Sequence, residues 1–169
     1  PADETLALLP LHPYGVSKVC QDLLTYQYFA NFNIKGIRAR IFNTTGPRKV
    51  NDICSDFTKQ VVQMEKGLIT TNKLRVGNLN TFRAITDVRD LVKALVLLCE
   101  KGKAGEVYNI SGSTIYKMSD IVEIIREKTQ IVFDVEIDKK LLRHTDEKII
   151  YGNSQKLIDQ VGWKQTYSL

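Results

Sequence analysis

Residues 14–41 read YGVSKVCQDLLTYQYFANFNIKGIRARI and predict a helix followed by a strand. After Tyr14 the apolar side chains recur with the helical period, at Val16, Val19, Cys20 and Leu23. The helix is expected to end near Asn33. Residues 37–41 then alternate between apolar and polar side chains, as a strand does.

The same alternation of helices and strands continues along the chain. Apolar spacing predicts helices near residues 57–64, 88–99 and 118–125, and strands near 74–76, 107–110, 135–137 and 149–151. Asp87 is expected to cap the helix whose apolar face is Val88, Leu91, Val92, Leu95, Leu98 and Cys99. Strands that alternate with helices indicate an α/β fold with parallel strand pairs. Because a helix comes first, the pattern is that of a doubly wound sheet beginning in its middle.

The composition is that of an ordinary globular protein. Of 169 residues, 43% are hydrophobic and 25% are charged, which excludes disordered and collagen-like chains. The longest apolar run, residues 91–99, contains Lys93 and is far shorter than the roughly 18–20 residues of a membrane span. No membrane helix is therefore expected. The sequence starts at Pro1 without an initiator methionine or signal peptide, so we expect a fragment or a processed product.

Charge and cysteine content narrow the expected partners. The sequence has 24 Lys and Arg against 19 Asp and Glu, a net charge of +5. The basic residues are dispersed, so nucleic acid is not expected as a partner, whereas a small anionic ligand such as a nucleotide diphosphate fits. Cys20, Cys54 and Cys99 are odd in number and far apart, which predicts free thiols in a reducing compartment, the cytoplasm, and no metal site.

Tyr14 and Lys18 are the first candidate for chemistry. Residues four apart on a helix share a face, so the phenol and the ammonium should project to the same side. A nearby cation favours the phenolate, which would allow the pair to exchange a proton at a carbon–oxygen centre. The alternative is the plain start of an amphipathic helix, because this spacing also occurs by chance.

Several ordered motifs resemble one enzyme family. HPYGVSK (12–18) resembles the active-site helix of the extended short-chain dehydrogenase/reductases, the NAD-dependent epimerase/dehydratase family. Further segments follow in the family's order: RIFNTTGPR (40–48), SDFTKQ (55–60), VGNL (76–79), TDVRD (86–90), EVYN (106–109), RHTD (143–146), GNSQKL (152–157) and VGWK (161–164). The resemblance covers essentially the whole chain. It is nearest to the GDP-6-deoxy-4-keto-D-mannose reductases, followed by the GDP-mannose 4,6-dehydratases.

The resemblance implies the roles of the catalytic and cofactor-binding residues. Tyr14 would give a proton to the sugar C4 oxygen as hydride arrives from NAD(P)H. Lys18 would lower the pKa of that phenol and bind the nicotinamide ribose. Ile41 and Thr44 would lie alongside the nicotinamide. Asn43 would hold the substrate diphosphate, although a residue between a strand and Gly-Pro can equally be a turn residue.

The resemblance also implies a site for a nucleotide-sugar, GDP-linked in the nearest branches. Its further substrate-binding residues would be Lys59, Val76, Asn78, Arg83, Arg143 and Asp146. The three cations would face phosphates, the valine and asparagine would lie beside the nucleobase, and the aspartate would have a polar role nearby. Each cation can instead be an ordinary exposed charge. The family's acidic and aromatic residues after the arginine are replaced by Ala84 and Ile85, which removes a carboxylate and an aromatic ring.

The resemblance also implies a domain division. Residues 1–50 would be the last part of a Rossmann-type NAD(P)-binding domain, and residues 51–169 mainly the small α/β substrate-binding domain. The helix near 87–101 and the strand near 107–110 would return to the Rossmann sheet. The glycine-rich turn G-x-G-x-x-G is absent, so the N-terminal half of the fold is missing and the piece alone should bind NAD(P) weakly. The helix that starts at Tyr14 resembles the one through which family members form homodimers.

Three functions remain open at this level. The first is the C-terminal part of a GDP-4-keto-6-deoxymannose reductase, active only within the intact protein. The second is a GDP-mannose 4,6-dehydratase or another nucleotide-sugar epimerase or dehydratase. The third, from a different class, is a module that binds a nucleotide-sugar without chemistry. Residues that select NAD or NADP would precede Pro1.

Overall fold

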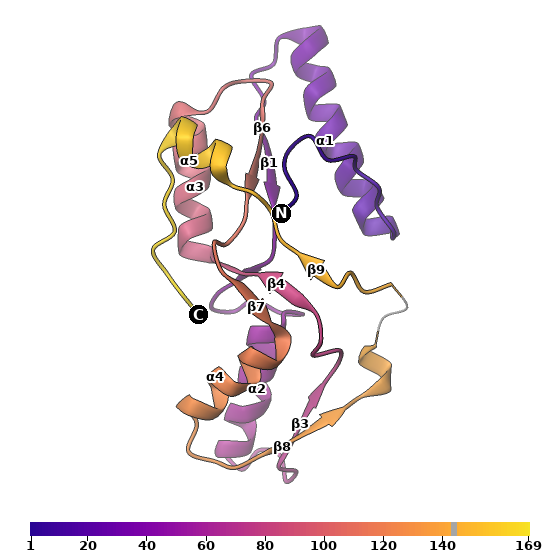
Figure 1. The fold of residues 1–169 in the computed structure, drawn as a ribbon, viewed down its shortest axis with the longest axis vertical. Helices are drawn as coiled ribbons and strands as arrows, with labels where there is room; N and C mark the ends of the chain where they lie inside the picture. Colours follow the sequence, from indigo (N-terminus) through magenta and orange to yellow (C-terminus); the bar gives the residue numbers. More distant parts are fainter. Residues whose placement is uncertain (143–144) are drawn as a thin grey trace. The chain divides into compact units, whose positions relative to one another are not determined.

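A computed structural model describes residues 1–142 and 145–169, which form two compact units (Figure 1). Unit 1 comprises Pro1–Thr44, Ala84–Ser113 and Tyr151–Leu169. Unit 2 comprises Thr45–Arg83 and Thr114–Ile150. The C-terminal segment thus belongs to the same unit as the N-terminal helix. Assignment of the units to cofactor and substrate stays a prediction.

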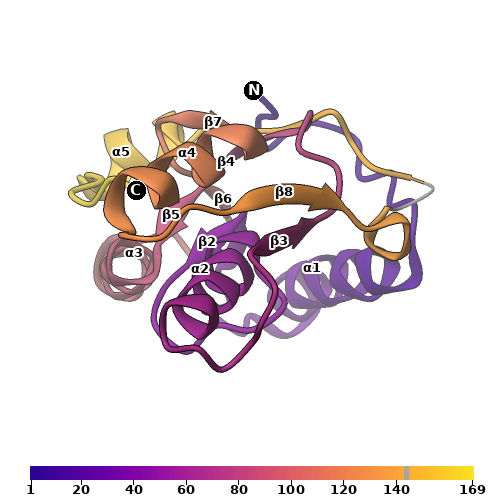
Figure 2. The same ribbon diagram turned by 90° about the horizontal axis from the view of Figure 1, so that it is seen from below.

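Unit 1 is built around a parallel strand pair between helices. Its elements are α1 (Pro13–Phe32), β1 (Arg38–Ile41), β5 (Thr86–Asp87), α3 (Val88–Lys101), β6 (Val107–Ile110) and α5 (Gln155–Val161). β1 and β6 pair in parallel register from Arg38 opposite Val107 to Ile41 opposite Ile110. α1 lies on one side of this pair, and α3 and α5 lie on the other (Figures 1 and 2). The core is formed by Ala94, Leu98, Tyr108, Ile110, Leu157, Val161 and Trp163.

The buried face of α3 differs from the face predicted by apolar spacing. Asp90, Ala94 and Leu98 are buried, whereas Val92 is half exposed and Cys99 is exposed. The apolar pattern was therefore wrong for the centre of this face. Apolar spacing cannot indicate that a carboxylate, that of Asp90, lies on the buried face.

Asp90 is buried because the C-terminal segment satisfies its carboxylate. Thr166 donates its backbone N–H at 2.9 Å and its hydroxyl at 2.6 Å, and the Tyr167 N–H donates at 2.8 Å. Burial by itself would raise the pKa of Asp90, but these hydrogen bonds outweigh it and hold the pKa below its ordinary value. Trp163 packs in the core and donates its indole N–H to the Asp90 carbonyl at 3.0 Å.

The N-terminal segment covers the outer edge of β6. The Asn109 N–H, which points away from β1, donates to the Glu4 carboxylate at 2.8 Å, and the Asn109 side-chain amide donates to the Ala2 carbonyl at 3.0 Å. Ala2 also forms a parallel bridge with Gly152. Within the described residues β1 pairs only with β6. The N-terminal segment therefore covers the β6 edge of this sheet, whereas no further described strand pairs at the β1 edge.

Unit 2 packs two helices with short parallel strand pairs. Its elements are α2 (Ile53–Glu65), β3 (Lys73–Val76), β7 (Ile115–Lys117), α4 (Met118–Lys128), β8 (Asp134–Ile137), a 3-10 turn η1 (Lys139–Leu141) and β9 (Ile149–Ile150). β2 (Thr44–Thr45) and β4 (Phe82–Ala84) contain the unit boundaries. β3 pairs with β8 in parallel (Figure 2), as β4 does with β9. These parallel pairs between helices confirm the expected α/β fold.

No helix in the described ranges is both long and apolar enough to cross a membrane. The three thiols are free, as expected.

Candidate active site

Tyr14 and Lys18 lie together on an exposed face of the first turns of α1. The Lys18 Nζ atom is 5.3 Å from the centre of the Tyr14 ring, and it donates a hydrogen bond to Gln21 Oε1 at 3.1 Å. The Tyr14 side chain is 68% exposed, so packing does not enclose it. The structure therefore brings the two expected catalytic residues together with the phenol open to a ligand.

The residues before Tyr14 determine where the helix begins. Pro13 occupies the first helical position, where its fixed φ favours the helix and its missing N–H costs no hydrogen bond. His12 is the N-cap, and its Nδ1 atom accepts the Gly15 N–H at 2.9 Å. Sequence reasoning missed this cap because Ser, Thr, Asp and Asn are the usual N-cap residues. The available signal was the position of His12 directly before Pro13.

The segment at the end of β1 carries Ile41 and Thr44, expected at the cofactor, and Asn43, expected at the substrate. Ile41 is half exposed and Asn43 is exposed, and the Asn43 carbonyl accepts the Thr86 N–H at 2.9 Å. Thr44 is partly buried in β2. α1 and β1 run in opposite directions, so the start of α1 and the end of β1 lie at the same end of unit 1 (Figure 1). Carboxyl ends of parallel strands are where dinucleotides bind in doubly wound folds.

In unit 2, Arg83 is held rigidly by its neighbours. It is 8% exposed, and its guanidinium donates to the carbonyls of Phe82 at 2.9 Å and Glu147 at 2.8 Å. It also forms an ion pair with Asp146 at 2.9 Å. Asn78 donates to the other oxygen of that carboxylate at 3.4 Å. Three of the expected substrate residues therefore form one cluster, in which Asp146 is bonded to the other two.

The remaining expected substrate residues do not join this cluster. Val76 is fully buried, because the alternation of β3 turns its side chain into the core of unit 2. Any contact with a nucleobase would have to use its main chain. Lys59 is exposed on α2. Arg143 lies outside the described residues.

Other features of the described residues provide no alternative catalytic centre. No group of three His, Cys, Asp or Glu side chains is arranged to hold a metal ion within residues 1–142 and 145–169. Burial and then the Asp52 carboxylate raise the pKa of the Cys54 thiol to about 11, so it is a poor nucleophile.

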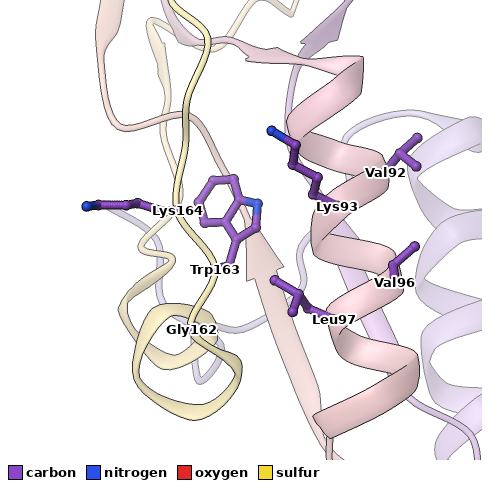
Figure 3. Close-up of a pocket in the computed structure, with 7 residues that line it drawn as sticks. All are labelled: Val92, Lys93, Val96, Leu97, Gly162, Trp163 and Lys164. Carbon is purple, nitrogen blue, oxygen red and sulfur yellow. The ribbon is translucent and has the colours of Figure 1, made fainter.

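A pocket of about 430 Å³ lies between α3 and the C-terminal segment of unit 1. Its lining residues are Val92, Lys93, Val96, Leu97, Gly162, Trp163 and Lys164. Leu97 and Lys93 point toward the Trp163 indole, and Val92 and Val96 lie on another side of the helix (Figure 3). Two lysines and an apolar wall offer no acid–base pair, so this pocket is not the candidate active site.

The whole chain matches the model of a known protein family. The family described as GDP-mannose 4,6 dehydratase matches residues 1–169. The chain belongs to this family. The membership expected from the motifs that begin with HPYGVSK (12–18) is therefore confirmed.

Two curated relatives fall within the enzyme classes expected from the motifs. The chain is 30% identical over 165 residues to a GDP-6-deoxy-D-mannose reductase of Pseudomonas aeruginosa, covering 97% of this chain and 54% of the relative. It is 25% identical over 167 residues to GDP-mannose 4,6 dehydratase 1 of Arabidopsis thaliana, covering 97% and 45% respectively. This member of the GDP-mannose 4,6 dehydratase family thus spans about half the length of these relatives.

Solved structures agree with this assignment. The structure of RMD from Pseudomonas aeruginosa complexed with NADPH matches with a TM-score of 0.89 and 29% identity, covering 98% of this chain and 55% of RMD. A dTDP-glucose 4,6-dehydratase from Bacillus anthracis in complex with NAD shares the fold, with a TM-score of 0.82 at 24% identity, covering 98% of this chain and 50% of that enzyme. The expected Rossmann-type fold is confirmed for the family member, and the solved relatives hold the expected class of cofactor.

Proposed function

We propose that this chain is the C-terminal part of an NAD(P)-dependent nucleotide-sugar reductase that acts on a GDP-linked 4-keto-6-deoxy sugar. The observation that carries the proposal is the exposed Tyr14 phenol with the Lys18 ammonium 5.3 Å from its ring. The 30% identity to a GDP-6-deoxy-D-mannose reductase supports the reductase over other reactions of the family.

The residues of unit 1 fit the nicotinamide end of NAD(P). Lys18 offers N–H donors for ribose hydroxyls, and exposed Ile41 beside Thr44 offers a wall at the strand end. NAD(P)H, when bound, supplies the hydride. Because these 169 residues contain no G-x-G-x-x-G turn, we propose that a dinucleotide-binding half of the same protein holds the pyrophosphate.

Tyr14 would act as the general acid. As the C4 carbonyl becomes an alkoxide, the phenol O–H bond breaks and the proton forms the new hydroxyl on the sugar. The phenolate that remains lies beside the Lys18 ammonium, which stabilises its charge. Solvent can return the proton because the Tyr14 side chain is 68% exposed.

The Arg83 cluster would recognise the substrate diphosphate. Guanidinium groups bind phosphate oxygens in pairs, and Arg83 is fixed by two carbonyls and the Asp146 carboxylate. Asp146 would therefore orient Arg83, with Asn78 attached to the same carboxylate. Lys59, exposed on α2 of the same unit, would add a donor for this anion.

The intact protein would be cytoplasmic, which three free thiols support. It would also form a homodimer through α1. Exposed aromatic and leucine side chains on that helix support this arrangement: Leu23, Leu24, Tyr26, Tyr28 and Phe32.

The test uses the intact protein with NADPH and a GDP-4-keto-6-deoxy sugar, followed by loss of NADPH absorbance. Tyr14→Phe removes the phenolic hydroxyl, and with it the proton, and should lower kcat by about 10²–10⁴-fold, the usual contribution of a general acid. Tyr26→Phe removes a hydroxyl from the same helix and serves as the matched control. Equal turnover by Tyr14→Phe and the control would contradict the assignment.

The same experiment separates the alternatives. A dehydratase or epimerase would convert its nucleotide-sugar without net oxidation of NADPH. A module without chemistry would bind a GDP-sugar by calorimetry and show no turnover in the intact protein.

A further inference from the structure

His12 makes two hydrogen bonds to the first turn of α1 and one ring contact with Tyr14. Its Nδ1 atom accepts the Gly15 N–H at 2.9 Å, and the Val16 N–H donates to its carbonyl at 3.1 Å in the first helical bond. Its imidazole also stacks with the Tyr14 ring, with centres 6.1 Å apart and planes at 19°. The cap residue therefore fixes both the turn and the ring of the proposed acid.

The packing around the cap leaves little room for adjustment. A Cβ atom on Gly15 would meet the Pro10 side chain at 2.9 Å and the His12 ring at 3.2 Å. His12 itself has extended backbone angles, φ −149° and ψ 156°, as an N-cap requires. Pro10, His12 and Gly15 are thus close together, and the exposed His12 imidazole lies where it accepts the Gly15 amide.

An imidazole differs from the usual N-cap oxygens in its proton chemistry. Nδ1 accepts a hydrogen bond only while it carries no proton, because both nitrogens are donors in the protonated ring. Histidine side chains gain a proton between about pH 5 and 8. A positive charge at a helix N-terminus is also opposed by the helix dipole. The cap is therefore present when the ring is neutral and is lost as the pH falls.

Two titratable groups adjoin His12 along this end of α1: the Tyr14 phenol, whose ring stacks with the imidazole, and the Lys18 ammonium, which lies over the Tyr14 ring. Protonation of His12 would remove the cap and loosen the turn that holds the phenol. The new cation would favour the phenolate, as Lys18 does, so the loss of activity is attributed to the lost cap.

We propose that His12 is a positioning residue for Tyr14, and that its protonation releases the first turn of α1 and so switches the enzyme off at acidic pH. The part that concerns activity rests on the proposed function. The part that concerns the cap rests on the His12–Gly15 hydrogen bond alone and is testable without turnover.

The first test compares kcat/KM at pH 8 and pH 5 in the intact protein with NADPH and the GDP-4-keto-6-deoxy sugar. His12→Ser keeps an oxygen acceptor that does not titrate, and His12→Ala removes the cap. Loss of the cap is expected to change the ratio of kcat/KM at pH 8 to kcat/KM at pH 5 about fivefold. The unchanged protein should therefore show a pH 8 to pH 5 ratio about fivefold larger than either variant. Equal ratios in the unchanged protein and His12→Ser would overturn the proposal.

The second test follows the Gly15 amide proton of the intact protein by NMR between pH 8 and pH 5. The resonance should move upfield as the cap is released, and should not move in His12→Ser. His144→Gln removes the other histidine of the sequence and should behave as the unchanged chain does. A Gly15 resonance independent of pH in the unchanged chain would overturn the inference whatever the activity. Inactivity of the intact protein with a titrating Gly15 amide would overturn the proposed function instead.

Discussion

Two helices of unit 1 differ sharply in how they are held. α1 has 20 residues and none of them is buried, whereas α3 has 14 residues and buries Asp90, Ala94 and Leu98. Both contain abundant apolar side chains. Apolar content therefore does not decide burial here, since α1 presents large hydrophobic groups to solvent on several sides.

The contacts of each helix explain the difference. α3 joins a core shared with β6, α5 and the C-terminal segment. α1 is held to β1 by Asp22, which forms ion pairs with Arg38 at 3.1 Å and Arg40 at 2.8 Å. It also packs Phe29 against Gly105. Glycine is required there for two reasons: its φ is +81°, and a Cβ atom at this position would lie 2.2 Å from the Phe29 ring. α3 is a core helix, and α1 is suited to carry a site and an interface.

Asp90 should give the largest effect on stability. Asp90→Ala leaves the Thr166 and Tyr167 N–H groups without a buried acceptor, so we expect a loss of about 3 kcal/mol in the free energy of unfolding. Urea denaturation of the 169-residue chain measures it. Asp159→Ala alters an exposed carboxylate and is the control. A loss below about 1 kcal/mol would show that the C-terminal segment does not depend on this carboxylate.

The same carboxylate predicts a pH dependence. The pKa of Asp90 is lowered when folded, because hydrogen bonds outweigh the burial that would raise it. The stabilisation is therefore complete above its ordinary value of 3.8 and is lost as the pH falls through the folded pKa. The difference in free energy of unfolding between the unchanged chain and Asp90→Asn should shrink as the pH is lowered from 7 to 3. A constant difference would contradict this sign.

Asp22 should give an intermediate effect. Asp22→Asn leaves Arg38 and Arg40 without their shared carboxylate, so we expect a loss of about 2 kcal/mol. Hydrogen exchange should show the loss as faster opening of α1 with α3 unaffected. Equal acceleration in both helices would mean that they unfold as one body and that the comparison fails.

Phe32 should have the smallest effect on stability and a larger one on association. Its side chain is 63% exposed, so Phe32→Ser should change the free energy of unfolding by no more than about 0.5 kcal/mol. If α1 forms the proposed dimer, the same change should weaken dimerisation of the intact protein at least about tenfold in sedimentation equilibrium. A dimer of unchanged affinity would remove this end of α1 from the interface.

Much of the fold was predictable from local pattern. The strand at 107–110 and the cap at Asp87 were predicted as found, and the helices that became α1, α2 and α4 were predicted close to their observed bounds. The strand at β9 was predicted, whereas β2 and β7, with two and three residues, carry too little periodicity to be recognised, and α5 has only seven residues. Burial of Asp90 was not predictable, because its partners lie more than seventy residues away.

The candidate site shows the same limit. The spacing of Tyr14 and Lys18 predicts their shared face because both lie on one helix. The bond between Arg83 and Asp146 joins distant segments, so neighbouring residues do not reveal it. The burial of Val76 followed from the alternation of β3, which could have been read from the sequence.

The way Glu4 caps the Asn109 amide has a consequence for assembly. An uncovered β6 edge could pair with an extended peptide, including another copy of this chain. Because Glu4 occupies this edge, the edge of β1 is the side of this sheet on which a further strand could pair, among the described residues. Open-ended assembly of many copies by edge-to-edge strand pairing is therefore disfavoured.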